Sequence, residues 1–310
     1  MKLATLDVGT NTVLMLIAER DANGAVHTIA DLARITRLGR GVDSSGRLDP
    51  ESAAQTLAAI AEFAQTARSL GVEKIIGVAT AALRDAKDGA DFIAQVKARA
   101  SVDLEIITGE AEAELSWLAV SKGLSLDPAA KVLIVDIGGG STELIRAEPG
   151  RKLELVSLQL GSVRLTERFV HHDPPTAREA ADLRLAVDEA LQNLGWDFTP
   201  EVMIGIAGTV TTVCAVTLEM TRYDPKIVHG HRLSQEDVIA AITKFGALPL
   251  AERKHLPGLE AGRADVIFAG AAILERIMGH FHLTEVVVSD QGVRWGLLWR
   301  TLDQSPNSAN

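Results

Sequence analysis

Two short turns rich in glycine and hydroxyl groups are the part of this chain best suited to bind an anion. Each turn directly follows an aspartate, Asp7 or Asp136. Glycine allows backbone conformations in which successive N–H groups point at one phosphate, and hydroxyls add donors. We therefore expect both turns to bind phosphate, while either turn alone also fits an ordinary hairpin. The expected phosphate-binding residues are Gly9, Thr10, Asn11 and Thr12 in the first turn and Gly138, Gly139, Gly140, Ser141 and Thr142 in the second.

Carboxylates beside the two turns are candidate ligands for Mg²⁺. Asp136 and Glu143 flank the second turn, and Asp7 precedes the first. Mg²⁺ keeps several waters and takes one or two protein carboxylates together with phosphate oxygens. We expect Mg²⁺ as the cofactor, held by Asp136 and Glu143, with Asp7 contributing through water. The alternative is that these acids cap turns or pair with arginines.

The two turns belong to an internal repeat. Asp7 and Asp136 are 129 positions apart (136 − 7), and at the same offset Ala18 aligns with Ala147. Each copy has the pattern of a strand ending in aspartate, a glycine-rich turn and a second strand. A matched pattern in each half of the chain predicts two related domains.

Apolar strands alternate with amphipathic helices along the chain, which predicts an α/β fold. A break at Asp127-Pro128 separates domains 1–126 and 127–310, and the last helix, 293–303, is expected to pack back onto the first domain. The predicted strands are 3–8, 13–19, 74–79, 104–108, 132–136, 143–147, 153–158, 202–207 and 285–289. The predicted helices are 50–70, 90–100, 110–122, 176–195, 210–220, 235–246, 264–279 and 292–302.

Charge and composition limit the possible partners. The formal net charge of −10 argues against broad binding of nucleic acid or anionic membranes. No apolar run approaches the ~20 residues of a membrane helix, and the first residues lack the pattern of a signal peptide. We expect a cytoplasmic protein with no nucleic-acid or membrane partner. A polyanionic substrate must then be attracted locally, by backbone N–H groups, a cation and a few arginines.

Eight segments, spread in order over nearly the whole chain, resemble the exopolyphosphatase/guanosine pentaphosphate phosphohydrolase (Ppx/GppA) family in its short two-domain form. That family belongs to the actin–Hsp70–sugar kinase superfamily. The resemblance implies two actin-like (ribonuclease H-like) domains with a central cleft. The segments are DVGTNT (7–12), TAALRDA (80–86), GEAEAEL (109–115), DIGGGSTE (136–143), GTVTT (208–212), HGHRL (229–233), RADVI (263–267) and SDQGVR (289–294).

The resemblance also implies a reaction, the Mg²⁺-dependent hydrolysis of a terminal phosphoanhydride bond by a homodimer. We expect an exopolyphosphatase acting on inorganic polyphosphate, with guanosine pentaphosphate (pppGpp) as the alternative substrate. The residues do not rank polyphosphate chain length against pppGpp. Two other hypotheses stay open: an ATP-dependent kinase of the same superfamily, and a sensor that binds polyphosphate or an alarmone nucleotide without turnover.

The resemblance assigns the catalytic base to Glu112 and a contact with the transferred phosphate to Arg84. If a helix begins near Glu110, Glu112 lies in its first turn, and the neighbours that share its face include no basic residue. The usual pair of glutamates is interrupted by Ala111, so Glu110 is an alternative base. Both acids could instead be solvated residues at a helix N-terminus, and Arg84 a surface arginine paired with a nearby aspartate.

Gly208 and Thr209 follow an apolar strand and resemble the superfamily's nucleotide-side loop. Their N–H groups, at the start of the next helix, are expected to hold a further phosphate. An ordinary turn from strand to helix is the alternative interpretation.

Overall fold

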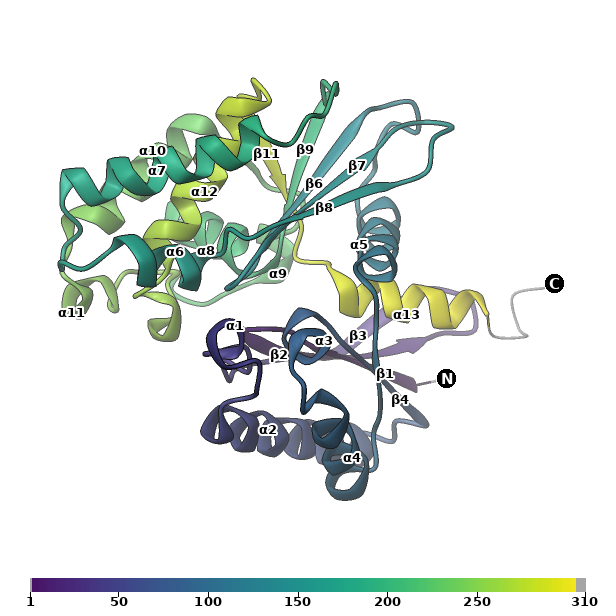
Figure 1. Cartoon of the computed structure of the whole chain (residues 1–310). Helices are drawn as coiled ribbons and strands as arrows, with labels where there is room; N and C mark the ends of the chain where they lie inside the picture. Colours follow the sequence, from purple (N-terminus) through teal and green to yellow (C-terminus); the bar gives the residue numbers. More distant parts are fainter. Residues whose placement is uncertain (1, 305–310) are drawn as a thin grey trace. The chain divides into compact units, whose positions relative to one another are not determined.

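The computed structural model describes residues 2–304, so residue 1 and residues 305–310 of the expected domains lie outside the described part. The chain divides into two compact units, each built on one sheet (Figure 1). Within the described range, unit 1 comprises residues 2–119 and 292–304, and unit 2 comprises residues 120–291. None of the helices in residues 2–304 combines the length and apolar character of a membrane span.

Unit 1 has a five-stranded sheet in the order β3-β2-β1-β4-β5. The first three strands form antiparallel pairs, and β1, β4 and β5 run parallel. The strands are β1 (Lys2–Val8), β2 (Thr12–Arg20), β3 (Val26–Ile35), β4 (Lys74–Ala79) and β5 (Asp103–Ile106). The helices are α1 (Val42–Ser45), α2 (Pro50–Ser69), α3 (Ala81–Asp85), α4 (Gly89–Ala100), α13 (Val293–Asp303) and α5 (Gly109–Gly123), whose last four residues belong to unit 2.

Unit 2 has a six-stranded sheet in the order β10-β11-β9-β6-β7-β8. Its strands are β6 (Val132–Ile137), β7 (Thr142–Ala147), β8 (Glu154–Leu158), β9 (Val202–Ile206), β10 (Arg232–Ser234) and β11 (Glu285–Val288). Its helices are α6 (Ser162–Phe169), α7 (Ala177–Gln192), α8 (Ala207–Thr217), α9 (Pro225–Val228), α10 (Gln235–Ala247), α11 (Leu250–Arg253) and α12 (Ile267–His280), with a 3₁₀ turn at Ala261–Arg263.

The two sheets confirm the internal repeat. Strands β8-β7-β6-β9-β11 repeat the order and the parallel or antiparallel pairing of β3-β2-β1-β4-β5. The turns repeat as well, because the N–H of Gly9 donates to the carbonyl of Thr12 at 3.1 Å and that of Gly138 to the carbonyl of Ser141 at 3.0 Å. The two units therefore share one strand order and one turn geometry.

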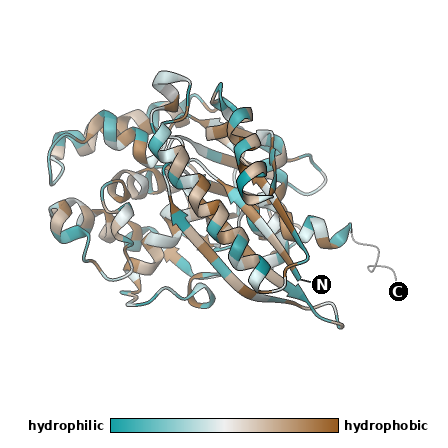
Figure 2. Ribbon diagram, turned by 90° about the horizontal axis from the view of Figure 1, so that it is seen from below, coloured by the Kyte–Doolittle hydropathy of each residue, from teal (hydrophilic) through white to brown (hydrophobic). Residues whose placement is uncertain are grey.

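Strand β1 faces two different layers of unit 1, as the period of two in a strand requires. Ala4, Leu6 and Val8 join the core beneath α2 and α4. On the other face Leu3 packs against α13, and the hydroxyl of Thr5 donates to the carbonyl of Arg294 at 2.8 Å. Figure 2 colours the ribbon by hydropathy, and both hydrophobic and hydrophilic residues occur along the strands and the helices.

Unit 2 is organised around α12, which packs against α6, α7, α8 and α10. Its core includes Cys214 on α8, the single cysteine of the chain. Burial raises the pKa of the Cys214 thiol to about 12, so this side chain is a small apolar core group at neutral pH.

The predicted strands and helices are all present, with ends shifted by a few residues at most. The sequence analysis missed β3, β10 and the short helices α1, α3, α6, α9 and α11. Strand β3 is at the edge of its sheet and largely exposed, so its ten residues lack a buried apolar alternation. The missed helices have eight residues or fewer, which is too short for a helical period to stand out.

Two helical glycines give opposite predictions for substitution by alanine. A Cβ at Gly296 on α13 would overlap the backbone carbonyl of Leu115 on α5, whereas a Cβ at Gly279 on α12 would meet nothing within 4 Å. Alanine normally stabilises a helix interior over glycine by about 1 kcal/mol. We expect Gly296→Ala to lower the midpoint of thermal unfolding and Gly279→Ala to leave it unchanged or raise it. Equal midpoints for the two variants would contradict the close contact of α13 with α5.

Candidate active site

The second glycine-rich turn, between β6 and β7, is held by the first turn of α6. The N–H of Ser162 donates to the carbonyl of Gly138 at 2.9 Å, and the N–H of Val163 to that of Gly139 at 2.9 Å. The carbonyl of Gly140 accepts from Nε of Arg164 at 2.7 Å. Three successive carbonyls of the turn therefore point at α6.

This arrangement fixes the direction of the N–H groups. In a trans peptide the C=O of one residue and the N–H of the next point in opposite directions. Since the carbonyls of Gly138, Gly139 and Gly140 face α6, the N–H groups of Gly139, Gly140 and Ser141 face away from it. Successive N–H groups on one side of a glycine-rich turn are the feature that anion-binding turns share.

Gly161, the residue before α6, allows this close approach. A Cβ at Gly161 would overlap the carbonyl oxygen of Gly139 and the carbonyl carbon of Gly140. Its φ of −136° is open to any residue, so the requirement for glycine is one of space alone. Position 161 was not singled out from the sequence, since its contact spans about twenty residues.

Asp136 and Glu143 are directly opposite each other in the antiparallel pair β6–β7, so their side chains share one face of the sheet. Two carboxylates at such positions repel each other unless a cation lies between them. Oε1 of Glu143 accepts hydrogen bonds from the hydroxyls of Ser141 and Ser157, both at 2.7 Å. The two serines fix one oxygen of Glu143 and thereby its orientation.

Three hydroxyls of the expected phosphate-binding set donate hydrogen bonds within the fold, and their role toward phosphate stays a prediction. Ser141 donates to Glu143, as described above. Thr142 is buried and donates to the carbonyl of Leu160 at 2.6 Å. Thr209 is buried and donates to the carbonyl of Ile137 at 3.0 Å. These hydroxyls hold the turn and the end of β6 in place, so the donors left for a ligand are mainly backbone N–H groups.

In the turn from β9 into α8, Gly208 lies close to the guanidinium of Arg263. Ala207 has a φ of 63°, which non-glycine residues rarely adopt and which often marks functional sites. A Cβ at Gly208 would overlap the guanidinium of Arg263. That guanidinium also contacts Glu260, from Nε to Oε2 at 3.3 Å. The start of α8 therefore combines backbone N–H groups with a held cationic side chain.

In unit 1, the first turn has a buried aspartate beside it. Oδ1 of Asp7 is buried and has no hydrogen-bond partner among the described residues. Burial raises the pKa of Asp7 from 3.8 to about 6, with the charge of Arg294 acting in the opposite direction. Arg294 itself is bound by Asp31 on β3, through contacts of 3.0 and 2.9 Å. An unsatisfied buried carboxylate is a natural place for a cation or its waters.

Glu112 and Arg84 are brought together in unit 1. Nη1 of Arg84, on α3, lies 3.4 Å from Oε2 of Glu112, on α5. The same nitrogen donates to the carbonyl of Ile107 at 3.0 Å. The neighbours on the same face of α5 include no basic residue, as expected, but Arg84 reaches Glu112 from a different helix. The expected surface alternative for Arg84, pairing with a nearby aspartate, is replaced by this contact with Glu112.

The two candidate bases differ in environment. The side chain of Glu112 is 16% exposed, whereas Glu110 is exposed to solvent. Hydrogen bonds from its own N–H and from the Thr108 hydroxyl lower the pKa of Glu110. Thr108 also caps α5, accepting from the N–H of Ala111 at 3.2 Å. Glu110 thus behaves as an acid at a helix N-terminus, and Glu112 is the more buried of the two candidate bases.

The carboxylates of unit 2 fit Mg²⁺. The part of the chain that the structure describes holds no group of three or more histidine, cysteine or acidic side chains able to enclose a metal. Mg²⁺ does not require such a group, because it keeps waters and takes one or two carboxylates. The opposed pair Asp136 and Glu143 supplies that number.

Comparison with known proteins identifies the family. Residues 16–305 match the sequence profile of the Ppx/GppA phosphatase family. The chain belongs to this family.

Curated members of the Ppx/GppA family and their solved structures resemble the chain over most of its length. Exopolyphosphatase 2 of Mycobacterium tuberculosis is 35% identical over 287 residues, which cover 89% of each chain. Exopolyphosphatase 1 of the same organism is 32% identical, covering 98% of this chain and 89% of the relative. The crystal structure of a Ppx/GppA family member from Aquifex aeolicus matches with a TM-score of 0.84 at 32% identity, covering 99% of each chain. The expectation of an α/β fold with two actin-like domains is confirmed.

Several residues that shape this Ppx/GppA site were missed from the sequence. Gly161 and Arg164 hold the second turn, Ser157 orients Glu143, and Asp31 binds Arg294. Arg263 was noticed only as part of a family motif. A sequence signal for this contact was present. The residues Gly-Ser-Val-Arg at 161–164 follow the β7–β8 hairpin directly and contain the glycine and the arginine that contact the turn.

The raised pKa of Asp7 predicts a gain of stability on neutralisation. The folded state holds the Asp7 proton more tightly than the unfolded chain, so this stabilisation is complete below pH 3.8 and is lost as the pH rises through about 6. We expect Asp7→Asn, in the absence of divalent cations, to raise the thermal unfolding midpoint at pH 7.5 and to lose this advantage by pH 4.

Asp85→Asn is the matched control for Asp7→Asn, because Asp85 is an exposed aspartate of the same unit. This control should not gain stability at pH 7.5. Calorimetric scans of the three proteins at both pH values measure the effect. A midpoint of Asp7→Asn at or below that of the wild type at pH 7.5 would contradict the cost assigned to the buried charge.

Proposed function

We propose that this protein is an exopolyphosphatase, which releases the terminal phosphate of inorganic polyphosphate by hydrolysis. The observation that carries the proposal is the β6–β7 turn, in which three backbone N–H groups face away from α6 beside the opposed carboxylates Asp136 and Glu143. Such a turn suits a phosphate accompanied by Mg²⁺. The names of the mycobacterial relatives, both exopolyphosphatases, support polyphosphate as the substrate class.

Unit 2 supplies groups that bind phosphate. The N–H groups of Gly139, Gly140 and Ser141 would hold phosphoryl oxygens, and the start of α8 at Gly208 would hold a further phosphate. We assign Mg²⁺ to Asp136 and Glu143, where it would neutralise negative charge on the non-bridging oxygens. Because the turn is fixed by α6, its donors need little rearrangement when the substrate binds.

Unit 1 supplies the base. We assign to Glu112 the removal of a proton from a water molecule, with Arg84 orienting the carboxylate and stabilising charge on the transferred group. The water oxygen forms a bond to the terminal phosphorus while the bond from that phosphorus to the bridging oxygen breaks. The products are inorganic phosphate and a chain shorter by one phosphate. The turn at Gly9–Thr12 and the Asp7 carboxylate are assigned to phosphate and to cation-bound water, respectively.

Several finer assignments stay predictions. They are the Mg²⁺ cofactor, the homodimer, the cytoplasmic location, the central cleft and the activity on pppGpp. The kinase and sensor hypotheses are separated from the phosphatase by turnover, since only the phosphatase releases phosphate from polyphosphate or pppGpp in water.

Phosphate release by the purified chain with Mg²⁺ tests the activity. Short polyphosphate, long polyphosphate, pppGpp and ATP are compared as substrates. We expect release from polyphosphate, and we expect Glu112→Gln to lower kcat by about 10²–10⁴-fold, the usual contribution of a general base. Glu110→Gln, two residues away, is the control and should stay within about threefold of the wild type. Wild-type kcat in Glu112→Gln would remove Glu112 as the base, and no release from any substrate would reject the phosphatase.

Metal dependence tests the carboxylate pair. We expect a chelator to abolish phosphate release, and we expect Glu143→Gln to raise the Mg²⁺ concentration for half-maximal activity at least about tenfold, because half of the carboxylate pair is lost. Glu154→Gln is the control, because Glu154 lies on the neighbouring strand and its side chain is half-exposed. This variant should reach half-maximal activity at the same Mg²⁺ concentration as the wild type. Full activity in the presence of chelator would contradict the assignment of Mg²⁺ to this pair.

A further inference from the structure

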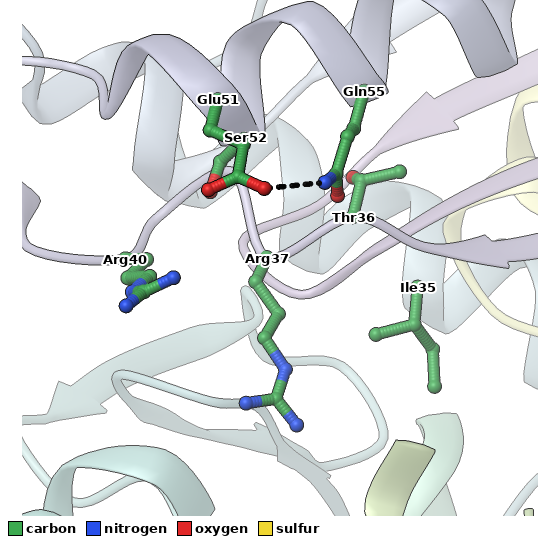
Figure 3. Close-up of a pocket in the computed structure, with 7 residues that line it drawn as sticks. All are labelled: Ile35, Thr36, Arg37, Arg40, Glu51, Ser52 and Gln55. Atoms are coloured by element: carbon green, nitrogen blue, oxygen red, sulfur yellow. Dashed lines mark hydrogen bonds between the residues drawn. The ribbon is translucent and has the colours of Figure 1, made fainter.

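Unit 1 contains a cavity of about 160 Å³ between the end of β3 and the start of α2 (Figure 3). Its lining includes two arginines, Arg37 and Arg40, and the polar side chains of Ser52 and Gln55 from α2. None of these residues has been given a role in the proposed reaction. The cavity therefore calls for its own explanation.

The loop that carries both arginines is fastened to the first glycine-rich turn. The N–H groups of Thr36 and Arg37 both donate to the carbonyl of Asn11 at 3.0 Å, and the N–H of Gly39 donates to the carbonyl of Thr10 at 2.8 Å. A Cβ at Gly39 would overlap the side chain of Thr10, so this approach also depends on a glycine. The loop that lines the cavity is thus hydrogen-bonded directly to the turn assigned to phosphate.

The same loop is fastened to α2. The hydroxyls of Thr36 and Thr56 are hydrogen-bonded at 2.8 Å in a buried position. Arg37 has a φ of 52°, which non-glycine residues seldom adopt, and it is held there by the bond to Asn11. Backbone held in such a conformation is frequent at ligand-binding sites.

The cavity is cationic within an acidic chain. Two guanidiniums and one carboxylate, that of Glu51, line it, whereas the whole chain has a net charge of −10. Glu51 is engaged with Gln55, whose Nε2 lies 3.3 Å from Oε1 of the acid. Figure 3 shows the Arg37 side chain extending away from Glu51 and Gln55.

We propose that Arg37 and Arg40 form a second phosphate subsite, which binds phosphates of the substrate that are not cleaved. The subsite rests on the proposed function and names what holds the remainder of the polyanion. Guanidinium groups bind phosphate oxygens through paired, charge-assisted hydrogen bonds. The phosphates could be internal groups of polyphosphate or the 3′-diphosphate of pppGpp, which share this chemistry. The subsite also answers how a chain of net negative charge retains a polyanion, because the attraction is local.

Binding of tripolyphosphate to the full chain, measured by calorimetry, tests the subsite without turnover. We expect the double variant Arg37→Gln/Arg40→Gln to bind tripolyphosphate about tenfold more weakly than the wild type. Arg99→Gln, which removes an exposed arginine on α4, is the control for net charge and should bind like the wild type. Arg37→Lys/Arg40→Lys keeps the charges and should recover part of the affinity, which separates loss of the subsite from misfolding. Equal dissociation constants for the wild type and the double Gln variant would overturn the subsite.

Steady-state kinetics separates the two sources of the phosphates. We expect the double Gln variant to raise KM about tenfold and to keep kcat within about twofold, since the arginines do not contact the reacting atoms. If KM rises only for long polyphosphate, the subsite binds the polyphosphate chain. If KM rises only for pppGpp, the subsite binds the 3′-diphosphate. Unchanged KM for every substrate, with an active wild type, would overturn the subsite while leaving the phosphatase in place. An inactive wild type would reject the phosphatase, and the calorimetric comparison would still decide the subsite.

Discussion

The contact of Gly161 with the backbone of Gly139 and Gly140 is the constraint on which the geometry of the β6–β7 turn depends. Only a residue without a side chain lets α6 begin close enough to bond three successive carbonyls. Those bonds satisfy the carbonyls and, through the planarity of the peptide, direct the N–H groups to the other side. The donors assigned to the substrate are thus set by a helix that need not touch it. Electrostatic preorganisation of this kind is effective because the dipoles are already oriented before the substrate arrives.

The two hairpins of the internal repeat have the same backbone arrangement but carry different side chains. Both hairpins have an aspartate one residue before the end of the first strand and the same hydrogen bond across the turn. The residue opposite Asp136 is Glu143, whereas the residue opposite Asp7 is Leu14. One hairpin therefore presents a pair of carboxylates, and the other presents a single carboxylate with one unsatisfied oxygen. This difference between the two hairpins comes from one cross-strand position and leaves the fold unchanged.

The sequence predicted the parts of this arrangement that are local. The turns, the acids beside them and the long helices could be recognised because each depends on neighbours within a few residues. The bracing of Gly138 to Gly140 by α6 and the contact of Arg84 with Glu112 join positions more than twenty residues apart, and no periodicity encodes them. The acceptors of the Thr142 and Thr209 hydroxyls could not be predicted for the same reason, because they come from distant segments. The pattern of acids alone left Glu110 and Glu112 open as the base, and the choice of Glu112 came from the resemblance to a family.

The position of α13 has a consequence for the order in which the chain can fold during synthesis. Leu3, Leu16 and Ala18 are covered by Leu298 and Leu302, so one face of the first sheet lacks its cover until the last helix has been made. Unit 2, by contrast, is a single continuous stretch, residues 120–291. A ribosome therefore releases every residue of unit 2 before unit 1 is complete, although unit 1 is begun first. The apolar side chains on this face of the N-terminal strands therefore stay uncovered until residues nearly three hundred positions later have been synthesised.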